Sequence, residues 1–143
     1  MTLYLDTSSL VKLYVSEAGS GAVRDLVDLA TVVATSSIAY TEARAALARR
    51  RRERTLAPRS LTAAKKALEA DWPRYLAVDV TPALCRSAGD LAERYRLRAY
   101  DSVHLASFAE VVEQSGREVI FSSFDAALNA AAGLLARRLG ARR

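Results

Sequence analysis

The sequence holds very little of the residue types on which many sites and small folds depend. It has one cysteine, Cys85, and one histidine, His104. A single cysteine excludes an internal disulfide and a zinc site built from cysteines, and we expect Cys85 to be a small core residue rather than a reactive thiol. Because His104 has no triad context around it, nucleophilic catalysis by a serine triad is not indicated. We interpret His104 as a helix residue near a site that other groups build.

The chain also lacks long apolar runs, internal repeats, low-complexity tracts and linkers. No apolar stretch approaches the roughly 20 residues of a membrane span. The N-terminus shows neither a basic leader segment nor a cleavage signal. Of the 143 residues, 51% are hydrophobic and 26% charged, which is typical of soluble globular domains. We therefore expect one domain over residues 1–143, in the cytoplasm and without membrane association.

Charge is distributed unevenly along the chain. The net charge is +5, and nine cations between residues 44 and 66 face a single acid, Glu53. Such a cluster favours a polyanionic partner such as nucleic acid. A solvated helix end with its loop, or contacts to a second protein, would explain the same charges.

Short apolar segments alternate with helical patterns through the whole sequence. We expect strands at residues 2–6, 31–35, 76–80 and 118–122, each short and rich in β-formers. Helical spacing predicts helices at 8–15, 22–30, for about 15 residues after Ser36 or Ser37, from Pro58 onward, and at 83–95, 101–114 and 124–139. This alternation predicts an α/β fold with a parallel sheet between helices. Ligands of such sheets gather beyond the carboxyl ends of the strands.

Four acids stand where that edge of the sheet would collect them. Asp6 ends the first strand, and Asp125 follows the last one. Glu42 and Asp101 lie on the otherwise apolar faces of two expected helices, where an acid needs a compensating partner. Since the sequence offers no matching internal cations, a bound metal ion is the predicted partner. Mg²⁺ and Mn²⁺ favour such oxygen ligands.

Each acid taken alone also has a purely structural explanation. Asp6 and Asp101 could start the helices that follow them, and residues 122–125 fit a Ser-x-x-acid capping box. Glu42 could extend to solvent or pair with the cations at 49–50. The case for a metal therefore depends on the four acids acting together.

Hydroxyl and basic side chains near the acids are candidates for supporting the site. Thr7, Ser8 and Ser122 could orient a carboxylate or a water held by the metal, or they could simply cap helices. The arginines at 96 and 98 precede Asp101 and could contact phosphate. Salt bridges from them to Glu93 or Asp90 are the alternative.

These residues resemble a known family, the PIN-domain ribonucleases, and within it the VapC-type toxins of prokaryotic toxin–antitoxin pairs. The resemblance is carried by LYLDTSSLVKLY at residues 3–14, TEA at 41–43, LRAYDSVHLA at 97–106 and FSSFD at 121–125. The first and third strings are fairly specific, the second is weak alone, and in order and spacing the four span nearly the whole chain.

The resemblance implies a single PIN-like domain with a three-layer α/β/α fold and a central parallel sheet of four to five short strands. It also implies a metal-dependent endoribonuclease that uses Mg²⁺ or Mn²⁺, an RNA substrate, a cognate antitoxin that docks on the helices after Asp6 and around residues 36–66, and a homodimer. The family's four acids carry over to Asp6, Glu42, Asp101 and Asp125, and its small hydroxyl residue to Ser8. We expect the first three acids to hold the metal directly, and Asp125 to bind it through water or to complete a second site.

One departure weakens the assignment of Asp125. In the family, a further charged residue often adjoins the last acid, whereas here Ala126 and Ala127 follow it. Two other functions compete with the ribonuclease. A haloacid-dehalogenase-type phosphohydrolase would need an acid at position 8, where Ser8 stands, and a well-placed lysine. A PIN-like scaffold that binds RNA or a partner without cutting is the alternative outside enzymes.

Overall fold

The computed structural model describes residues 1–140 and has a central sheet of four parallel strands. The strands are β1 (Thr2–Leu5), β2 (Val32–Ser36), β3 (Leu76–Val78) and β4 (Val119–Ser122), in the spatial order β3-β2-β1-β4. Tyr4 lies opposite Ala34 on one side and Phe121 on the other. The predicted α/β class with a parallel sheet is confirmed. All strand carboxyl ends point to one edge of this sheet.

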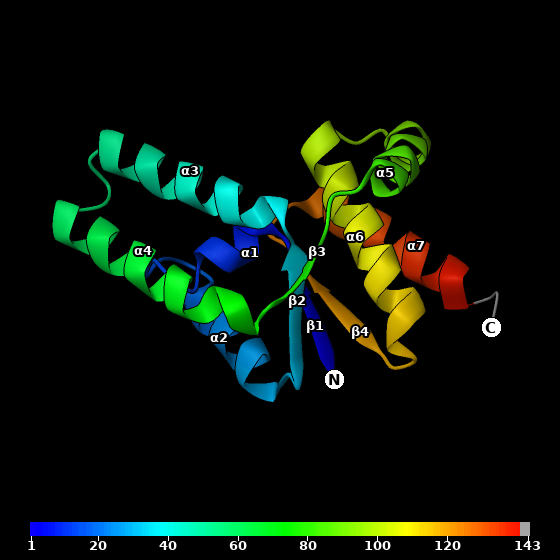
Figure 1. The fold of residues 1–143 in the computed structure, drawn as a ribbon, viewed down its shortest axis with the longest axis horizontal. Coiled ribbons are helices and arrows are strands. Elements are labelled where there is room, and N and C mark those ends of the chain that lie inside the picture. The colour runs from blue at the N-terminus through cyan, green and yellow to red at the C-terminus, as the bar shows by residue number, and fades with distance from the viewer. Residues whose placement is uncertain (141–143) are drawn as a thin grey trace.

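Helices cover both faces of the sheet (Figure 1). One layer holds α1 (Thr7–Val11), α2 (Ser20–Leu29), α3 (Ile38–Arg52) and α4 (Pro58–Asp71), followed by the short 3₁₀ helix η1 (Trp72–Arg74). The other layer holds α5 (Pro82–Tyr95), α6 (Ala99–Ser115) and α7 (Ala126–Gly140). None of the helices described for residues 1–140 is long and apolar enough to cross a membrane.

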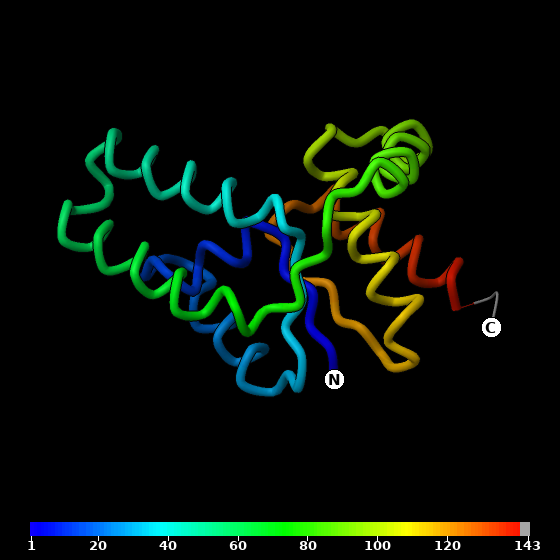
Figure 2. The backbone as a smooth tube through the Cα atoms, viewed as in Figure 1, coloured from blue at the N-terminus to red at the C-terminus, as the bar shows by residue number. Residues whose placement is uncertain are grey.

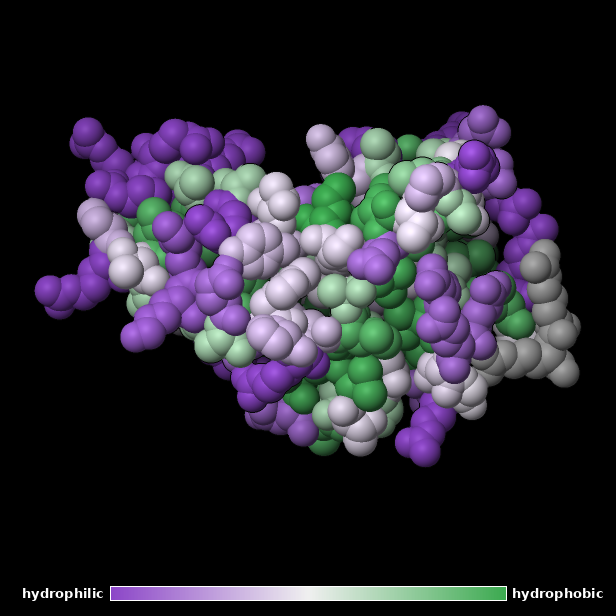
Figure 3. All heavy atoms as spheres, in the orientation of Figure 1, coloured by the Kyte–Doolittle hydropathy of each residue, from purple (hydrophilic) through white to green (hydrophobic). Residues whose placement is uncertain are grey.

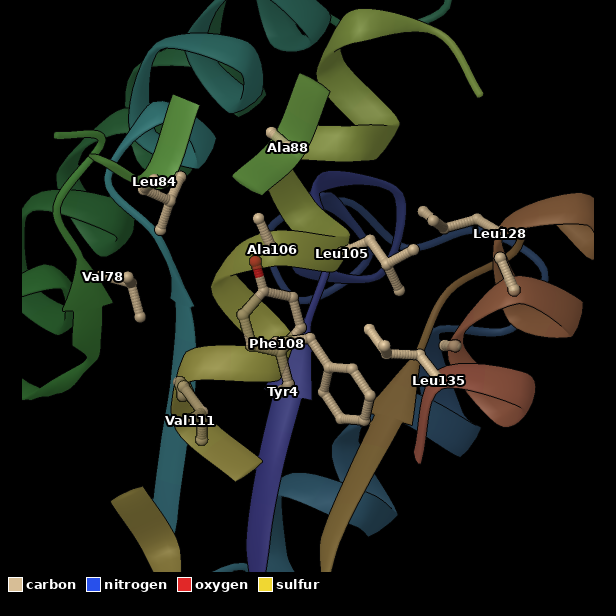
Figure 4. Close-up of a cluster of buried hydrophobic side chains, with 13 residues drawn as sticks. Tyr4, Val78, Leu84, Ala88, Leu105, Ala106, Phe108, Val111, Leu128 and Leu135 are labelled. Atoms are coloured by element: carbon tan, nitrogen blue, oxygen red, sulfur yellow. The ribbon is translucent and has the colours of Figure 1, made fainter. Parts of the chain in front are cut away.

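Strand β1 is the centre of both hydrophobic cores, because all four of its residues are buried. Side chains alternate between the two faces of a strand. Tyr4 therefore joins the core with α5, α6 and α7, while Leu3 and Leu5 join the core with α1 to α4. Figure 4 shows Tyr4 among Leu105 and Phe108 of α6. A buried strand next to polar residues 6–9 places those polar groups at the edge of a rigid core.

Helices α3 and α4 form a hairpin that projects away from the sheet (Figure 2). Leu47 of α3 and the pair Ala64 and Leu68 of α4 are buried where the two helices pack. The projecting end is covered by hydrophilic side chains in Figure 3, which also shows the molecule hollowed between this hairpin and α5. The carboxyl ends of β1 and β2 lie behind this hollow, between the starts of α3 and α6 (Figure 1).

Two expectations from the sequence are wrong in detail. Helix α1 ends at Val11 rather than near Val15, because the N–H groups of Lys12, Leu13 and Tyr14 bond to carbonyls three residues back and tighten the chain into turns. Cys85 is exposed rather than part of the core. Leu84 and Ala88 are the buried residues of α5, and Cys85 lies 100° further around the helix.

Candidate active site

The site lies at the carboxyl ends of β1 and β4, which are neighbours in the sheet. Leu5 pairs with Ser122, and the Asp6 N–H donates to the Ser122 carbonyl at 3.1 Å, which continues the ladder one residue beyond β1. The chain then turns into α1 on one side and into the loop 123–125 on the other. This geometry brings Asp6 next to Ser123 although 117 positions separate them.

Asp6 is the most enclosed acid of the site, with only 5% of its surface exposed. Its Oδ1 accepts hydrogen bonds from the Ser8 hydroxyl at 2.7 Å and from the Ser9 N–H at 3.0 Å. Its Oδ2 accepts from the Ser123 hydroxyl at 2.6 Å. Asp6 thus caps α1, as the structural alternative predicted. These bonds use both lone pairs of Oδ1 and one of Oδ2, so Oδ2 keeps a lone pair for a further partner.

Glu42 is held from α3 by a pair of side chains on other elements. Its Oε1 accepts from the Thr7 hydroxyl at 2.7 Å and from His104 Nε2 at 2.8 Å. Burial alone would raise the pKa of Glu42, but the hydrogen bonds from His104 and Thr7 outweigh it and hold that pKa below its ordinary value. The alternative in which Glu42 pairs with Arg49 or Arg50 is wrong, since those arginines pair with Glu53 and Glu17.

His104 connects this site to the core of the molecule. It is 2% exposed, and its Nδ1 lies 2.9 Å from the Tyr4 hydroxyl. With the proton on Nε2, the ring donates to Glu42 and accepts from Tyr4. Burial raises the pKa of Tyr4 well above its ordinary value, which keeps its hydroxyl protonated as a donor. His104 therefore fixes Glu42 against the sheet, as expected of a helix residue near the site.

Asp101 and Asp125 share one cation, Arg98. The guanidinium Nε lies 3.3 Å from Asp101 Oδ2, and an NH2 nitrogen lies 3.9 Å from Asp125 Oδ2. The expected alternative partners of Arg98, Glu93 and Asp90, are not the ones used. Arg98 is 80% exposed, and an ion pair this open to water is weak. The two acids are thus compensated by a side chain that is easily displaced.

The four predicted acids form one connected group around the strand ends. The Ser123 hydroxyl joins Asp6 to Asp125, because it donates to Asp6 and accepts from the Asp125 N–H at 3.0 Å. Arg98 joins Asp125 to Asp101, and Thr7, which directly follows Asp6 in the chain, donates to Glu42. Within residues 1–140, no three His, Cys, Asp or Glu side chains are close enough to form a ready metal site. The acids converge on one region, with hydroxyl groups and one guanidinium between them.

The supporting hydroxyls differ in part from those expected. Ser8 contacts Asp6 as predicted, but the Ser122 hydroxyl bonds to Ser9 Oγ at 2.8 Å rather than to an acid. Ser123 contacts Asp6 instead. The expected Ser122 capping box is also not the cap of α7, because the Leu128 N–H donates to Asp125 Oδ1 at 2.9 Å. The alternation of side chains along a strand explains why Ser123 rather than Ser122 contacts Asp6. Ser122 is the last residue of β4 and is buried, whereas Ser123 is the first residue beyond the strand.

The donor set suits a hard divalent cation. Carboxylate and hydroxyl oxygens surround Asp6, and such oxygens are the ligands that Mg²⁺ and Mn²⁺ prefer. Sulfur is absent from the contacts described above, and the nitrogen of His104 is already used on Glu42 and Tyr4. The chemistry of the group therefore fits Mg²⁺ or Mn²⁺ and does not fit a softer metal.

Comparison with known proteins identifies the family of the chain. The family model for the PIN domain matches residues 3–134. Ribonuclease VapC45 of Mycobacterium tuberculosis (strain CDC 1551 / Oshkosh) is 38% identical over 105 residues, which is 73% of this chain and 73% of the relative. Ribonuclease VapC49 of Mycobacterium tuberculosis (strain ATCC 25618 / H37Rv) matches with the same identity and coverage. The chain therefore belongs to the PIN-domain family and is related to its VapC ribonucleases.

Proposed function

We propose that this protein is a metal-dependent endoribonuclease that hydrolyses RNA phosphodiester bonds as the toxin of a type II toxin–antitoxin system. The observation that carries the proposal is the connected group of Asp6, Glu42, Asp101 and Asp125 at the strand ends of a PIN domain. The relatives at 38% identity are named ribonucleases, which supports the reaction class. The cytoplasm is the proposed location, because the proposed RNA substrate would be met there.

Asp6, Glu42 and Asp101 would hold Mg²⁺ or Mn²⁺ directly, with Asp125 binding through water or at a second position. When bound, the cation supplies positive charge against the phosphodiester and activates the attacking water. The protein's own side chains keep the acids in place. Ser8, Ser9 and Ser123 fix both oxygens of Asp6, while Thr7 and His104 fix Glu42. Fixed carboxylates need little reorganisation when the substrate arrives.

Arg98 acts on the same acids from the solvent side. Without a metal, it offsets the repulsion between Asp101 and Asp125. With a divalent cation held by the acids, the exposed guanidinium of Arg98 would no longer be needed to compensate them and would be free to contact an RNA phosphate. The substrate is RNA and the second partner is a cognate antitoxin on the surface of α1 and the α3–α4 hairpin. A homodimer completes the proposed assembly.

The proposal is tested by cleavage of RNA with the purified full-length protein in Mg²⁺ or Mn²⁺. Asp6→Asn is expected to abolish cleavage while the thermal unfolding curve and circular dichroism stay those of a folded protein. Asp28→Asn is the matched control, because Asp28 is an exposed acid of α2. EDTA should abolish RNA cleavage by the parent protein. Cleavage by Asp6→Asn at the parent rate would refute the site, and RNA binding without any cleavage would favour the non-cutting scaffold.

A further inference from the structure

We propose that Ser9 and Ser122, whose hydroxyls bond to each other behind the acids, are positioning residues that set the place of Asp125 relative to Asp6. The inference rests on the proposed metal-dependent ribonuclease and adds two residues whose hydroxyls touch none of its acids. It is carried by the burial of this pair, by the two segments that it joins, and by the few other contacts that fix Asp125.

Two Ser-Ser dipeptides stand at the strand ends that carry the site. One lies at the start of α1, and the other spans the end of β4. One hydroxyl of each dipeptide bonds to Asp6, from Ser8 at 2.7 Å and from Ser123 at 2.6 Å. The remaining two hydroxyls, of Ser9 and Ser122, bond to each other at 2.8 Å. The dipeptides therefore interlock at two levels, one on the acid and one in the layer behind it.

The Ser9–Ser122 pair is enclosed by the protein. Ser9 is fully buried and Ser122 is 9% exposed. In the part of the chain that the structure describes, neither hydroxyl bonds to a third group. A buried hydroxyl that loses its partner is unfavourable, so each hydroxyl holds the other in place. The pair thus joins α1 to β4 across 113 positions of the sequence.

Asp6 is fixed without help from these two hydroxyls. Its backbone N–H donates to the Ser122 carbonyl at 3.1 Å, and its Oδ1 accepts from the Ser9 N–H at 3.0 Å. Both bonds use backbone groups of the pair and persist when a side chain is changed. Removal of the hydroxyls is therefore expected to leave Asp6 in place.

The loop after β4 carries Asp125, and its start is held by Ser122. Ser123 and Phe124, the two residues between them, add bonds to side chains that precede Ser9 in the chain. Those two bonds lie nearer the solvent, whereas the Ser9–Ser122 bond is buried. A hydrogen bond is stronger in the protein interior than in water. The pair therefore anchors the loop from the inside.

The other contacts of Asp125 do not relate it to Asp6. Its Oδ1 accepts from the Leu128 N–H at 2.9 Å, which fixes it to α7, and its Oδ2 lies 3.9 Å from the exposed Arg98. A functional side chain has to lie within about 0.5 Å of its productive position. The distance between the two acids is thus set by the loop, and the loop by the pair at its start. Ser122 would in this way support the site through Ser9.

The first measurement is amide hydrogen exchange by NMR on the full-length protein without metal. Ser122→Val replaces the hydroxyl by a methyl group, and Ser122→Thr is the matched variant that keeps a hydroxyl on nearly the same shape. In folded Ser122→Val, the amides of Phe124 and Asp125 should exchange roughly ten-fold faster, and the amide of Asp6 should keep its rate. Ser122→Thr should keep all three rates. Ser9→Ala should reproduce the effect of Ser122→Val, and the double variant should add nothing further.

The second measurement is Mn²⁺ binding followed by electron paramagnetic resonance. Ser122→Val is expected to bind Mn²⁺ roughly three- to ten-fold more weakly, because groups behind the ligands orient them. Ser20→Ala is the control for a purely structural effect. Ser20 is also buried, but its hydroxyl bonds to the Val15 carbonyl at 2.9 Å, away from the four acids. This variant should lose stability and keep the Mn²⁺ affinity of the parent.

The results separate this inference from the function on which it rests. Unchanged exchange at Phe124 and Asp125 in folded Ser122→Val would overturn the inference, even if the parent protein cuts RNA in Mg²⁺. An equal loss of Mn²⁺ affinity in Ser20→Ala and Ser122→Val would also overturn it, because the effect would then follow stability alone. Faster exchange at Asp125 in Ser122→Val, when the parent neither binds Mn²⁺ nor cuts RNA, would refute the proposed function and keep the placement of Asp125 by the pair.

Discussion

At the scale of single residues, the acids of this site differ in how firmly they are held. Asp6 accepts three hydrogen bonds while almost fully enclosed, and Glu42 accepts two from Thr7 and His104. Asp101 and Asp125 instead share an exposed guanidinium. The first two acids therefore give the site its fixed geometry, and the other two would be free to change partner in the proposed complex with a metal and RNA.

His104 offers a direct test of that fixed geometry. His104→Leu leaves the Tyr4 hydroxyl without its ring nitrogen and Glu42 without its strongest donor, and buried polar groups without partners cost about 1–3 kcal/mol each. We expect the free energy of unfolding in urea to fall by about 2–3 kcal/mol. Tyr4→Phe removes only the hydroxyl and should cost about 1 kcal/mol.

The rate of RNA cleavage distinguishes a positioning role of His104 from a purely structural one. If His104 positions Glu42, His104→Gln should lose rate mainly in kcat, even at temperatures where the variant is fully folded, because only Glu42 has lost its orientation. Equal kcat for His104→Gln and the parent would show that His104 serves stability alone.

The sequence identifies the acids better than their supporting side chains. Asp6 and Asp125 follow apolar runs and Glu42 interrupts an apolar face, so each carries a local signal. The contacts of Ser123 and His104 have no such signal, because they join positions 117 and 62 residues apart. The hydroxyl of Tyr4, within the otherwise apolar run of residues 3–5, is the one hint in the sequence. A buried hydroxyl needs a hydrogen-bond partner, and His104 of the adjacent helix layer supplies it.

At the scale of elements, the turn between α1 and α2 depends on a single residue without a side chain. Gly19 combines φ +90° with contact to the Phe124 ring, whereas Gly21 lies within α2 with nothing near a Cβ. Gly19→Ala is expected to lower the free energy of unfolding by about 1–2 kcal/mol. Gly21→Ala should raise it by about 0.5–1 kcal/mol. Thermal unfolding of both variants checks the pair, and equal shifts would contradict the account of this turn.

The same turn carries a pH dependence through Glu17. Burial raises the pKa of Glu17, but Lys12 and Arg50 outweigh this and leave it below the ordinary value of 4.5. A depressed folded pKa stabilises the fold above the unfolded pKa, and that stability disappears as the pH falls through the folded value. Glu17→Gln should therefore cost about 1 kcal/mol near neutral pH and almost nothing by about pH 3.

Glu53 is the control for this experiment. Its pair with Arg49 is open to solvent on both sides, so Glu53→Gln should leave the unfolding free energy unchanged at every pH. A loss for Glu17→Gln that persists at low pH would mean that the glutamate acts through packing rather than through its charge. The measurement is the free energy of unfolding in urea for Glu17→Gln and Glu53→Gln at a series of acid pH values.

Helix and strand positions follow from the sequence to within a few residues, with α1 as the main exception. Periodicity extends α1 to Val15, since Val11 and Val15 share a face and both are buried. The chain nevertheless tightens into turns after Val11, and Lys12 bonds to Glu17 and to the Ala18 carbonyl. These contacts lie in the following turn, and no helical pattern contains them.

At the scale of the whole molecule, the parallel sheet brings acids that are distant in the sequence to one edge. Strands β1, β2 and β4 end at one edge, and helices α3 and α6 start close to it (Figure 1). The strand pattern in the sequence is enough to predict this edge and the two faces of β1. The strand order is not encoded in any local pattern, because it depends on which helix layers pack against Tyr4 and against Leu3 and Leu5.

The central claim is that these acids together bind a divalent cation, and titration with Mn²⁺ followed by electron paramagnetic resonance tests it most directly. The parent protein is expected to bind Mn²⁺ with saturation, Asp6→Asn and Asp101→Asn to lose that binding, and Asp28→Asn to keep it. Saturable Mn²⁺ binding that is unchanged in folded Asp6→Asn and Asp101→Asn would contradict the account.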